Sequence, residues 1–187
     1  MNRSELAHVL RAAAEVTNDP EILVIGSQAI LASFSETELP DEAVHSIEVD
    51  LAFLDDPDEH KADAVDGAIG ELSLFHETFG VYGQGVSIAT ATLPSGWRDR
   101  LVAFASVEAG ASTAVCLEPH DLVVSKLVAG REKDYRFAQA LLAARLVDLG
   151  TLLARAELLP GPPGIRHRVK RWIERVGRRS QSRRAPS

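Results

Sequence analysis

Cysteine is nearly absent from this sequence of 187 residues, and no apolar run is long enough to span a bilayer. The one cysteine, Cys116, excludes an intrachain disulfide and a zinc site built from cysteines, and its apolar neighbours indicate a core strand. The residues after Met1 lack the pattern of a secretory signal peptide, and no two histidines stand at metal-binding spacing. We therefore expect a cytoplasmic protein with no membrane partner.

Apolar and charged residues are present in ordinary proportions, 45% and 25% of the chain, as in a globular domain. The net charge of −7 is unevenly distributed. Residues 161–187 contain nine Lys or Arg and one acid, so they carry +8 and residues 1–160 carry −15. This asymmetry indicates a polyanionic partner that binds the tail. The alternative is a helix that packs its apolar stripe on the core and keeps the chain in solution.

Periodicity and turn residues predict an α+β fold with a mixed β-sheet and a helical C-terminal part. The expected helices cover residues 3–17, 28–33, 61–72, 119–128, 131–146 and 152–158, with a basic helix after the linker at 159–164 and a frayed end at 180–187. In the first of them, Leu6, Val9, Leu10 and Ala13 fall on one apolar face. The expected strands cover residues 22–25 and 47–53, with two or three more between 75 and 115, and an exposed loop surrounds Pro40. We expect three parts: a core at 1–117, a helical region completing the functional site at 118–160, and the basic helix and tail at 161–187.

Two carboxylates stand two residues apart on the second expected strand. Successive side chains of a strand point to opposite faces, so Glu48 and Asp50 share one face while Val49 and Leu51 lie on the other. Two carboxylates this close repel each other unless a cation lies between them. Their oxygen atoms are ligands that suit Mg²⁺ or Mn²⁺. An arbitrary pair at this spacing is more often a solvated strand face, so the surrounding motifs decide between the two interpretations.

A Gly-Ser turn, Gly26-Ser27, lies between the first expected strand and a helical segment. Glycine permits close backbone approach, and a hydroxyl with N–H groups at a helix start suits a phosphate. Such turns are common when taken alone. The order of buried strand, Gly-Ser, helix, loop and acid-bearing strand resembles the polymerase-β-type nucleotidyltransferase fold.

A later segment, Ser125–Asp134, places Lys126 on an otherwise apolar helix and an acid after a glycine break. The lysine either extends along the helix to solvent or is aimed at an anion. Together with Ile25–Ile30 and Ser46–Asp50, this segment resembles the signature of the AbiEii/MenT-like nucleotidyltransferase toxins of bacterial toxin–antitoxin systems.

The resemblance extends over roughly residues 20–146 and implies roles for particular side chains. It implies catalytic roles for four of them, metal binding by the two strand acids, and nucleotide binding by the turn and by two cations. The catalytic set is Glu48, Asp50, Lys126 and Asp134, the metal ligands are Glu48 and Asp50, and the nucleotide-binding set is Gly26, Ser27, Lys126 and Arg131. The chain departs from the family where Glu48 replaces the commoner Asp and where Phe137 stands in place of a further acid.

The function that the resemblance implies is metal-dependent transfer of a nucleotide from an NTP, with Mg²⁺ or Mn²⁺ as cofactor. The acceptor would be RNA, with the 3′ end of tRNA as the expected target and residues 165–184 as the RNA contact. The protein would be the toxin of a toxin–antitoxin pair, with a cognate antitoxin protein as partner. Two alternatives stay open: transfer to a small molecule or protein, and an inactive nucleotidyltransferase fold that only binds.

Four further residues are weaker candidates. Ser46 shares the strand face of Glu48, so phosphorylation there would place negative charge at the metal site and inhibit the enzyme. Arg98 and Arg100 could bind phosphate or RNA, or could form salt bridges. His76 could line an acceptor pocket, although a structural histidine is the simpler interpretation.

Overall fold

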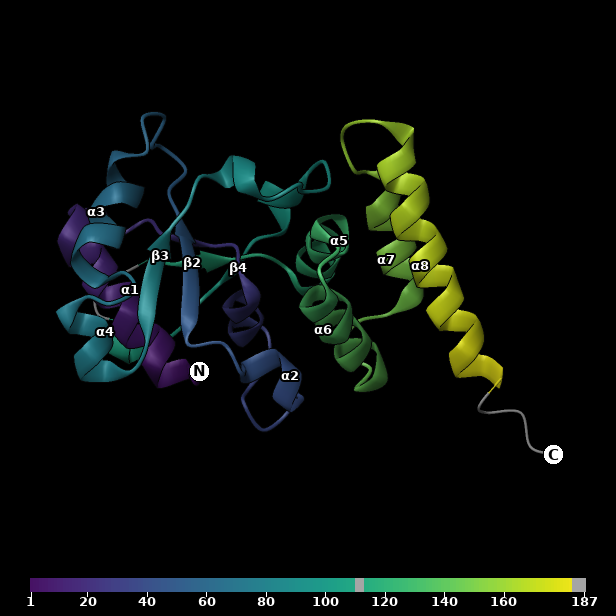
Figure 1. Cartoon of the computed structure of the whole chain (residues 1–187), viewed down its shortest axis with the longest axis horizontal. Helices are drawn as coiled ribbons and strands as arrows, with labels where there is room; N and C mark the ends of the chain where they lie inside the picture. The colour runs from purple at the N-terminus through teal and green to yellow at the C-terminus, as the bar shows by residue number, and fades with distance from the viewer. Residues whose placement is uncertain (110–112, 183–187) are drawn as a thin grey trace.

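A mixed five-stranded sheet forms the centre of the N-terminal two thirds of the chain (Figure 1). The computed structural model describes residues 1–109 and 113–182. The strand order is β3-β2-β1-β5-β4, with β1 and β5 parallel, β2 and β3 parallel, and the other two pairings antiparallel. The predicted α+β class with a mixed sheet is confirmed. The strands are β1 (Leu23–Val24), β2 (Glu48–Ala52), β3 (Tyr82–Gly85), β4 (Val102–Ala103) and β5 (Val115–Cys116).

The first helix, α1 (Arg3–Thr17), matches the predicted bounds. Asn2 and Glu5 form a capping box at its start, and Asn18 in the left-handed conformation ends it. Its apolar stripe is fully buried against β3 and against α3 (His60–Ile69), so the 3.6-residue periodicity located the core face correctly. The buried residues of that stripe are Leu6, Ala7, Val9, Leu10 and Ala13.

Three local predictions need correction. The helix expected at 28–33 is a 3-10 helix, η1 (Ser27–Ala32), and the expected loop contains a one-turn helix, α2 (Asp41–Val44). The region between residues 75 and 115 holds three strands as expected, but it begins with a helix, α4 (Leu74–Phe79), because the Ser73 hydroxyl accepts a hydrogen bond from His76 N and caps that segment. The 3-10 helices η2 (Ile88–Thr90), η3 (Trp97–Arg100) and η4 (Val107–Ala109) occupy part of the remainder.

Four helices form the C-terminal part: α5 (Pro119–Ala129), α6 (Glu132–Ala143), α7 (Leu149–Glu157) and α8 (Pro163–Ser182). Gly130 separates the first two at φ +70°, which confirms the predicted break. In Figure 1, α5 and α6 stand between the sheet and the α7–α8 pair. Helix α8 begins inside the expected linker and runs to Ser182, so residues 180–182 of the expected frayed end are helical, and residues 183–187 lie outside the described residues.

Helix α8 packs its apolar stripe against α5 and α7. Val169, Trp172 and Ile173 are buried, so the packing alternative holds for this face of the basic helix. Within residues 1–109 and 113–182, no helix combines the length and apolar character needed to cross a bilayer. The division into 1–117, 118–160 and 161–187 stays a prediction.

A buried ion cluster joins the helical part to η3. The carboxylate of Asp121, 1% exposed, accepts hydrogen bonds from Arg100 Nε (2.7 Å) and Nη2 (3.1 Å). Arg155 of α7 lies 3.2 Å away on the same carboxylate. Arg100 therefore forms the salt bridge that was one of its two predicted roles. Cys116 is also buried as predicted, and burial raises the pKa of its thiol to about 12.

Replacing Asp121 with alanine is expected to lower the free energy of unfolding by about 3 kcal/mol, because two partly buried guanidinium groups lose their counter-charge. Chemical denaturation of the purified protein measures this. Glu132→Ala is the matched control, since it removes an exposed carboxylate paired with Arg136 and should cost less than about 1 kcal/mol. Equal effects of the two substitutions would contradict a structural role for the cluster.

Candidate active site

The two predicted carboxylates lie on one face of β2, between β3 and β1 in the sheet. Val49 and Leu51 are fully buried on the opposite face, so the predicted alternation is confirmed. Glu48 and Asp50 are half-buried, and both line a cavity of about 330 Å³. This volume is within the range of small-molecule sites.

Gly26 allows the carboxylate of Asp50 to lie against the backbone. A Cβ atom placed on Gly26 would fall 1.7 Å from Asp50 Oδ2 and 2.6 Å from its Cγ. The backbone there has φ −85°, which any residue adopts, so glycine is needed for the close approach and not for the conformation. The backbone N–H of Ile25 donates to the carbonyl of Asp50 at 3.1 Å and fixes the two segments together. Ser27 begins η1 beside this contact but does not line the cavity.

Burial and the neighbouring charge of Glu48 raise the pKa of Asp50 to about 6, although Lys126 acts in the opposite direction. The hydroxyl of Tyr82 donates to Glu48 Oε2 at 3.1 Å. Burial, together with the Glu48 charge, raises the pKa of Tyr82 to about 12, so this hydroxyl keeps its proton at neutral pH. Tyr82 was missed in the sequence because its position opposite Glu48 depends on the register of β2 and β3. Gln84 takes the corresponding place opposite Asp50.

Lys126 of α5 points inward and not along the helix to solvent. Its side chain is 11% exposed, its Nζ is 3.6 Å from Asp134 Oδ1, and it stands 5.0 Å above the ring centroid of Phe137. Burial lowers the pKa of Lys126, while Asp134 and Asp50 oppose that shift. The structure therefore favours the second of the two sequence interpretations, in which the ammonium group is aimed at anions.

Asp134 lies behind Lys126 and does not line the cavity. It accepts hydrogen bonds from Arg131 Nε at 2.8 Å, Arg131 Nη2 at 3.2 Å and the Arg131 backbone N–H at 3.1 Å. Burial opposes ionisation of this carboxyl, but the bonds from Arg131 and the charge of Lys126 lower its pKa. Asp134 thus fixes both cations in place, and Arg131 itself lines the cavity.

The cavity has an anionic wall and a cationic wall. Glu48 and Asp50 form the first, and Lys126 and Arg131 form the second. Such an arrangement can bind a group that carries negative charge on one side and a cation on the other. The other lining residues are Ile25, Gly26, Gln84, Val86, Thr90, Ala91, Thr92, Ser125, Val128 and Ala129.

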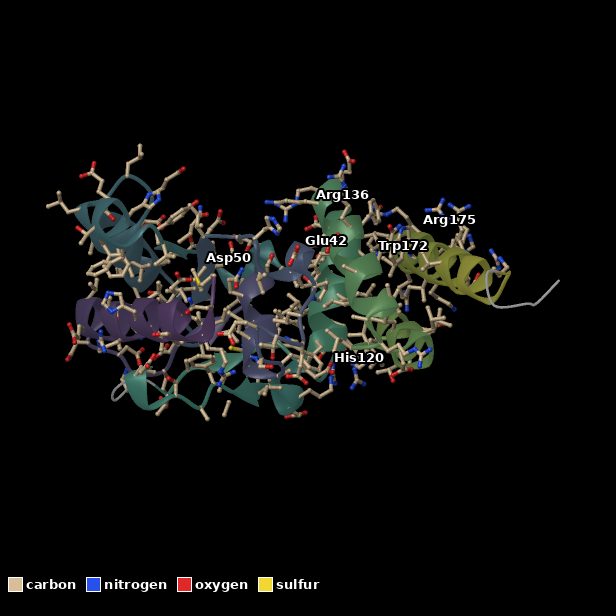
Figure 2. The ribbon with its side chains drawn as sticks, turned by 90° about the horizontal axis from the view of Figure 1, so that it is seen from below. Glu42, Asp50, His120, Arg136, Trp172 and Arg175 are labelled. Atoms are coloured by element: carbon tan, nitrogen blue, oxygen red, sulfur yellow. The ribbon has the colours of Figure 1, made fainter. Side chains whose placement is uncertain are left out.

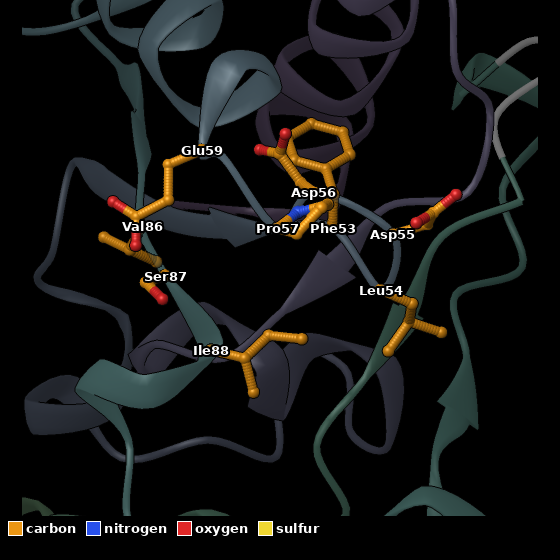
Figure 3. Close-up of a pocket in the computed structure, with 9 residues that line it drawn as sticks. All are labelled: Phe53, Leu54, Asp55, Asp56, Pro57, Glu59, Val86, Ser87 and Ile88. Atoms are coloured by element: carbon orange, nitrogen blue, oxygen red, sulfur yellow. The ribbon is translucent and has the colours of Figure 1, made fainter.

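A smaller cavity of about 220 Å³ lies next to it and shares Val86 (Figure 3). Asp55, Asp56 and Glu59 line it, and Asp56 caps α3 by accepting from the backbone N–H of Lys61. Three acids would repel a triphosphate, so this cavity does not extend the phosphate site.

The weaker candidates lie outside the main cavity. The Ser46 hydroxyl and the backbone of Glu48 are joined by hydrogen bonds of 3.2 Å. Arg98 is exposed and stands 5.1 Å over the ring of Trp97. His76 Nδ1 accepts from the backbone N–H of Leu72 at 3.1 Å, which fits the structural interpretation of this histidine.

A family model described as "Nucleotidyltransferase of unknown function (DUF6036)" matches residues 4–158. The chain belongs to this family. The mixed sheet with its helices is accordingly a nucleotidyltransferase-type α+β fold, as predicted. No curated protein and no solved structure matches the sequence. The DUF6036 match ends before α8, so the basic helix lies outside the matched region.

The carboxylates at this site of the DUF6036 member supply part of the ligand set that a divalent cation needs. Across the described ranges, no group of three or more His, Cys, Asp or Glu side chains could hold a metal. Glu48 and Asp50 supply two carboxylates, which suits an ion that takes its remaining ligands from phosphate oxygens and water. The contact of Asp50 with Gly26 holds one of these carboxylates in a fixed position.

Proposed function

We propose that this protein transfers a nucleotide from an NTP to an RNA acceptor. The observation that carries the proposal is the cavity in which the Glu48 and Asp50 carboxylates face the cations of Lys126 and Arg131. We expect the acceptor to be the 3′ end of tRNA and the protein to be the toxin of a toxin–antitoxin pair, as the resemblance to the AbiEii/MenT-like toxins implies. A cognate antitoxin protein would then be its partner.

Glu48 and Asp50 would hold Mg²⁺ or Mn²⁺. When bound, this ion supplies positive charge at the α-phosphate and lowers the pKa of the acceptor hydroxyl. Lys126 and Arg131 bind the triphosphate from the opposite wall. The acceptor oxygen bonds to the α-phosphorus as its proton leaves to solvent, and the bond from that phosphorus to the β-phosphate oxygen breaks, releasing pyrophosphate. Asp134 acts as a positioning residue, because it contacts the two cations and not the cavity.

Incubating the protein with total tRNA, Mg²⁺ and each α-labelled NTP in turn tests this function. We expect label on the tRNA with the full chain and none with Asp50→Ala. Label on a small molecule or protein instead of RNA would support the second acceptor class. No label with any NTP would contradict the proposal and favour an inactive binding module. Phe137 supports that alternative, because it stands where the resemblance implies a further acid.

Deleting residues 161–187 would not separate RNA from small-molecule acceptors. Trp172 and Ile173 are buried, so the deletion would expose the core beneath α8. Substituting exposed arginines of α8 keeps that core and removes only charge. This is the cleaner way to ask whether the basic helix serves the acceptor.

The raised pKa of Asp50 predicts that metal binding weakens in acid. With a pKa of about 6, the carboxyl is mostly ionised at pH 7.5 and mostly protonated at pH 5.5. A metal ion needs the ionised form, so the affinity for Mn²⁺ should fall about fourfold from this group between the two pH values. Calorimetric titration with Mn²⁺ at the two pH values measures this affinity. Asp50→Asn should abolish its dependence on pH. Equal affinity of the full chain at pH 7.5 and pH 5.5 would contradict the prediction.

Phosphorylation of Ser46 is expected to inhibit the enzyme. Its hydroxyl is joined to the backbone of Glu48, so a phosphate there would place negative charge at the metal site and compete with the triphosphate for the same positive charge. Ser46→Asp should slow label transfer about tenfold, and Ser46→Ala should change it little. Full activity of the aspartate variant would contradict the hypothesis.

A further inference from the structure

A third cavity, of about 440 Å³, lies between α6 and α8. Its lining residues are Tyr135, Arg168, Arg171, Trp172, Arg175 and Arg178, and together they are called the arginine cavity below. In Figure 2, Trp172 and Arg175 lie on the same side of the molecule as Asp50 and Arg136, whereas His120 lies on the opposite side.

The arginine cavity gathers four guanidinium groups that lack an acidic partner among the described side chains. None of the four is within ion-pair distance of a carboxylate there. Lys170 of the same helix, by contrast, contacts Glu157 of α7. Four like charges around one cavity repel each other, so a bound anion would relieve that repulsion.

The floor of the arginine cavity is aromatic and fixed. The rings of Tyr135 and Trp172 stack with centroids 5.5 Å apart and an interplanar angle of 23°. Trp172 is 7% exposed, while Arg171 and Arg175, which line the same cavity, are exposed. A helix face that only contacts solvent does not need a cavity with stacked aromatic rings. Arginines and aromatic rings around one cavity suit nucleic-acid strands, whose phosphates and bases need both kinds of contact.

One turn of the chain separates the two cavities. Arg168 Nη2 donates to the carbonyl of Val128 at 2.6 Å, and Arg168 Nη1 lies 2.7 Å from where a Cβ on Gly130 would stand. Val128 and Arg131 line the active cavity. The turn from α5 to α6 therefore lines the active cavity and is hydrogen-bonded to Arg168, which lines the arginine cavity. A ligand in one cavity would lie close to a ligand in the other.

We propose that the arginine cavity binds the phosphate backbone of an unpaired RNA strand, next to the end that enters the active cavity. The proposal rests on the function proposed above. It narrows the expected RNA contact to the lining residues of the arginine cavity and specifies that the bound strand is unpaired. Arg168 and Arg178 are ten residues apart, about 15 Å along the helix. Phosphates of one strand stand roughly 3.4 Å apart along a duplex axis and farther apart in an extended unpaired strand, so this row exceeds a single phosphate and extends over several.

Fluorescence anisotropy of the full chain with a labelled 12-nucleotide oligo-uridine tests the proposal. We expect binding to weaken with salt at a slope near −2.8 in log K against log salt, since each single-strand phosphate contact contributes about −0.7. The double variant Arg171→Gln/Arg175→Gln should bind roughly tenfold more weakly, with a slope shallower by about 1.4. Circular dichroism shows whether the variant stays folded, which is expected because both side chains are exposed.

Arg166→Gln is the matched control. It removes one cation from the same helix without touching the cavity lining, so the affinity for oligo-uridine should stay within about twofold of the full chain. Equal losses from Arg166→Gln and from the double variant would overturn the proposal. A 12-base-pair duplex that binds more tightly than the single strand, or a poly-glutamate peptide that competes as well as RNA, would overturn the assignment to an unpaired strand.

Binding and transfer fail independently in these experiments. Asp50→Ala should keep the affinity for oligo-uridine while losing label transfer, because Asp50 does not line the arginine cavity. Label transfer to RNA that persists unchanged in the double variant would overturn the arginine cavity and leave the proposed function standing. Arginine-dependent RNA binding with no transfer under any NTP would support the cavity and contradict the proposed function.

Discussion

Gly26→Ala is expected to reduce nucleotide transfer about 100-fold or more while the chain stays folded. The new methyl group would need the space of Asp50 Oδ2, 1.7 Å away, so the carboxylate must turn out of the position in which it faces Glu48 and Lys126. A displacement of about 1 Å at a reacting centre is enough for a loss of this size. Label transfer and Mn²⁺ titration measure the two consequences, and both should fall together.

Gly67→Ala is the matched control for this substitution. Gly67 lies in α3 with no atom within 4 Å of an added Cβ, so alanine should fit and stabilise the helix by about 0.5–1 kcal/mol without changing transfer. Thermal unfolding of both variants separates misfolding from a local effect. Normal transfer by folded Gly26→Ala would mean that the position of Asp50 against the turn is not required.

Lys126→Met is expected to reduce transfer about 1,000-fold. The methionine keeps the apolar stem of the side chain but removes the cation that faces Asp50 and Asp134. A buried charge aimed at a developing negative charge commonly contributes this much to catalysis. The pKa of Asp50 should also rise further, because Lys126 is the largest influence that lowers it. Steady-state kinetics against NTP concentration measures the loss.

Lys170→Met is the control for the lysine substitution. It breaks the contact with Glu157 of α7, and neither residue lines the active cavity, so transfer should change less than twofold. Near-normal transfer by Lys126→Met would contradict the role of Lys126 and leave Arg131 as the cation that binds the triphosphate.

The parts of the fold that follow a simple period could be predicted from the sequence. The apolar stripe of α1 and the alternation around Glu48 and Asp50 were located correctly, because burial on one face is the cause of both patterns. The glycine break at Gly130 was also correct, because the backbone there has φ +70°. Helix α4 was missed, since its start depends on a single capping hydroxyl within a stretch rich in strand-forming residues.

The parts of the site that depend on contacts between distant segments could not be predicted. Tyr82 reaches Glu48 only because β3 pairs with β2 in one register. The contact of Asp134 with both Lys126 and Arg131 requires the angle between α5 and α6. The arginine cavity joins Tyr135 to a helix about 35 residues later in the chain, and neither segment alone indicates a hollow between them.

The half-buried carboxylate of Asp50 beside Glu48 has a consequence for folding stability. Because its pKa is raised from 3.8 to about 6, ionising it in the empty site costs on the order of 3 kcal/mol, so a neutral side chain at this position should stabilise the fold. Under the proposed function, position 50 therefore gives up folding stability in exchange for metal binding. Asp50→Asn should unfold at a higher temperature than the unchanged protein while it loses affinity for the metal.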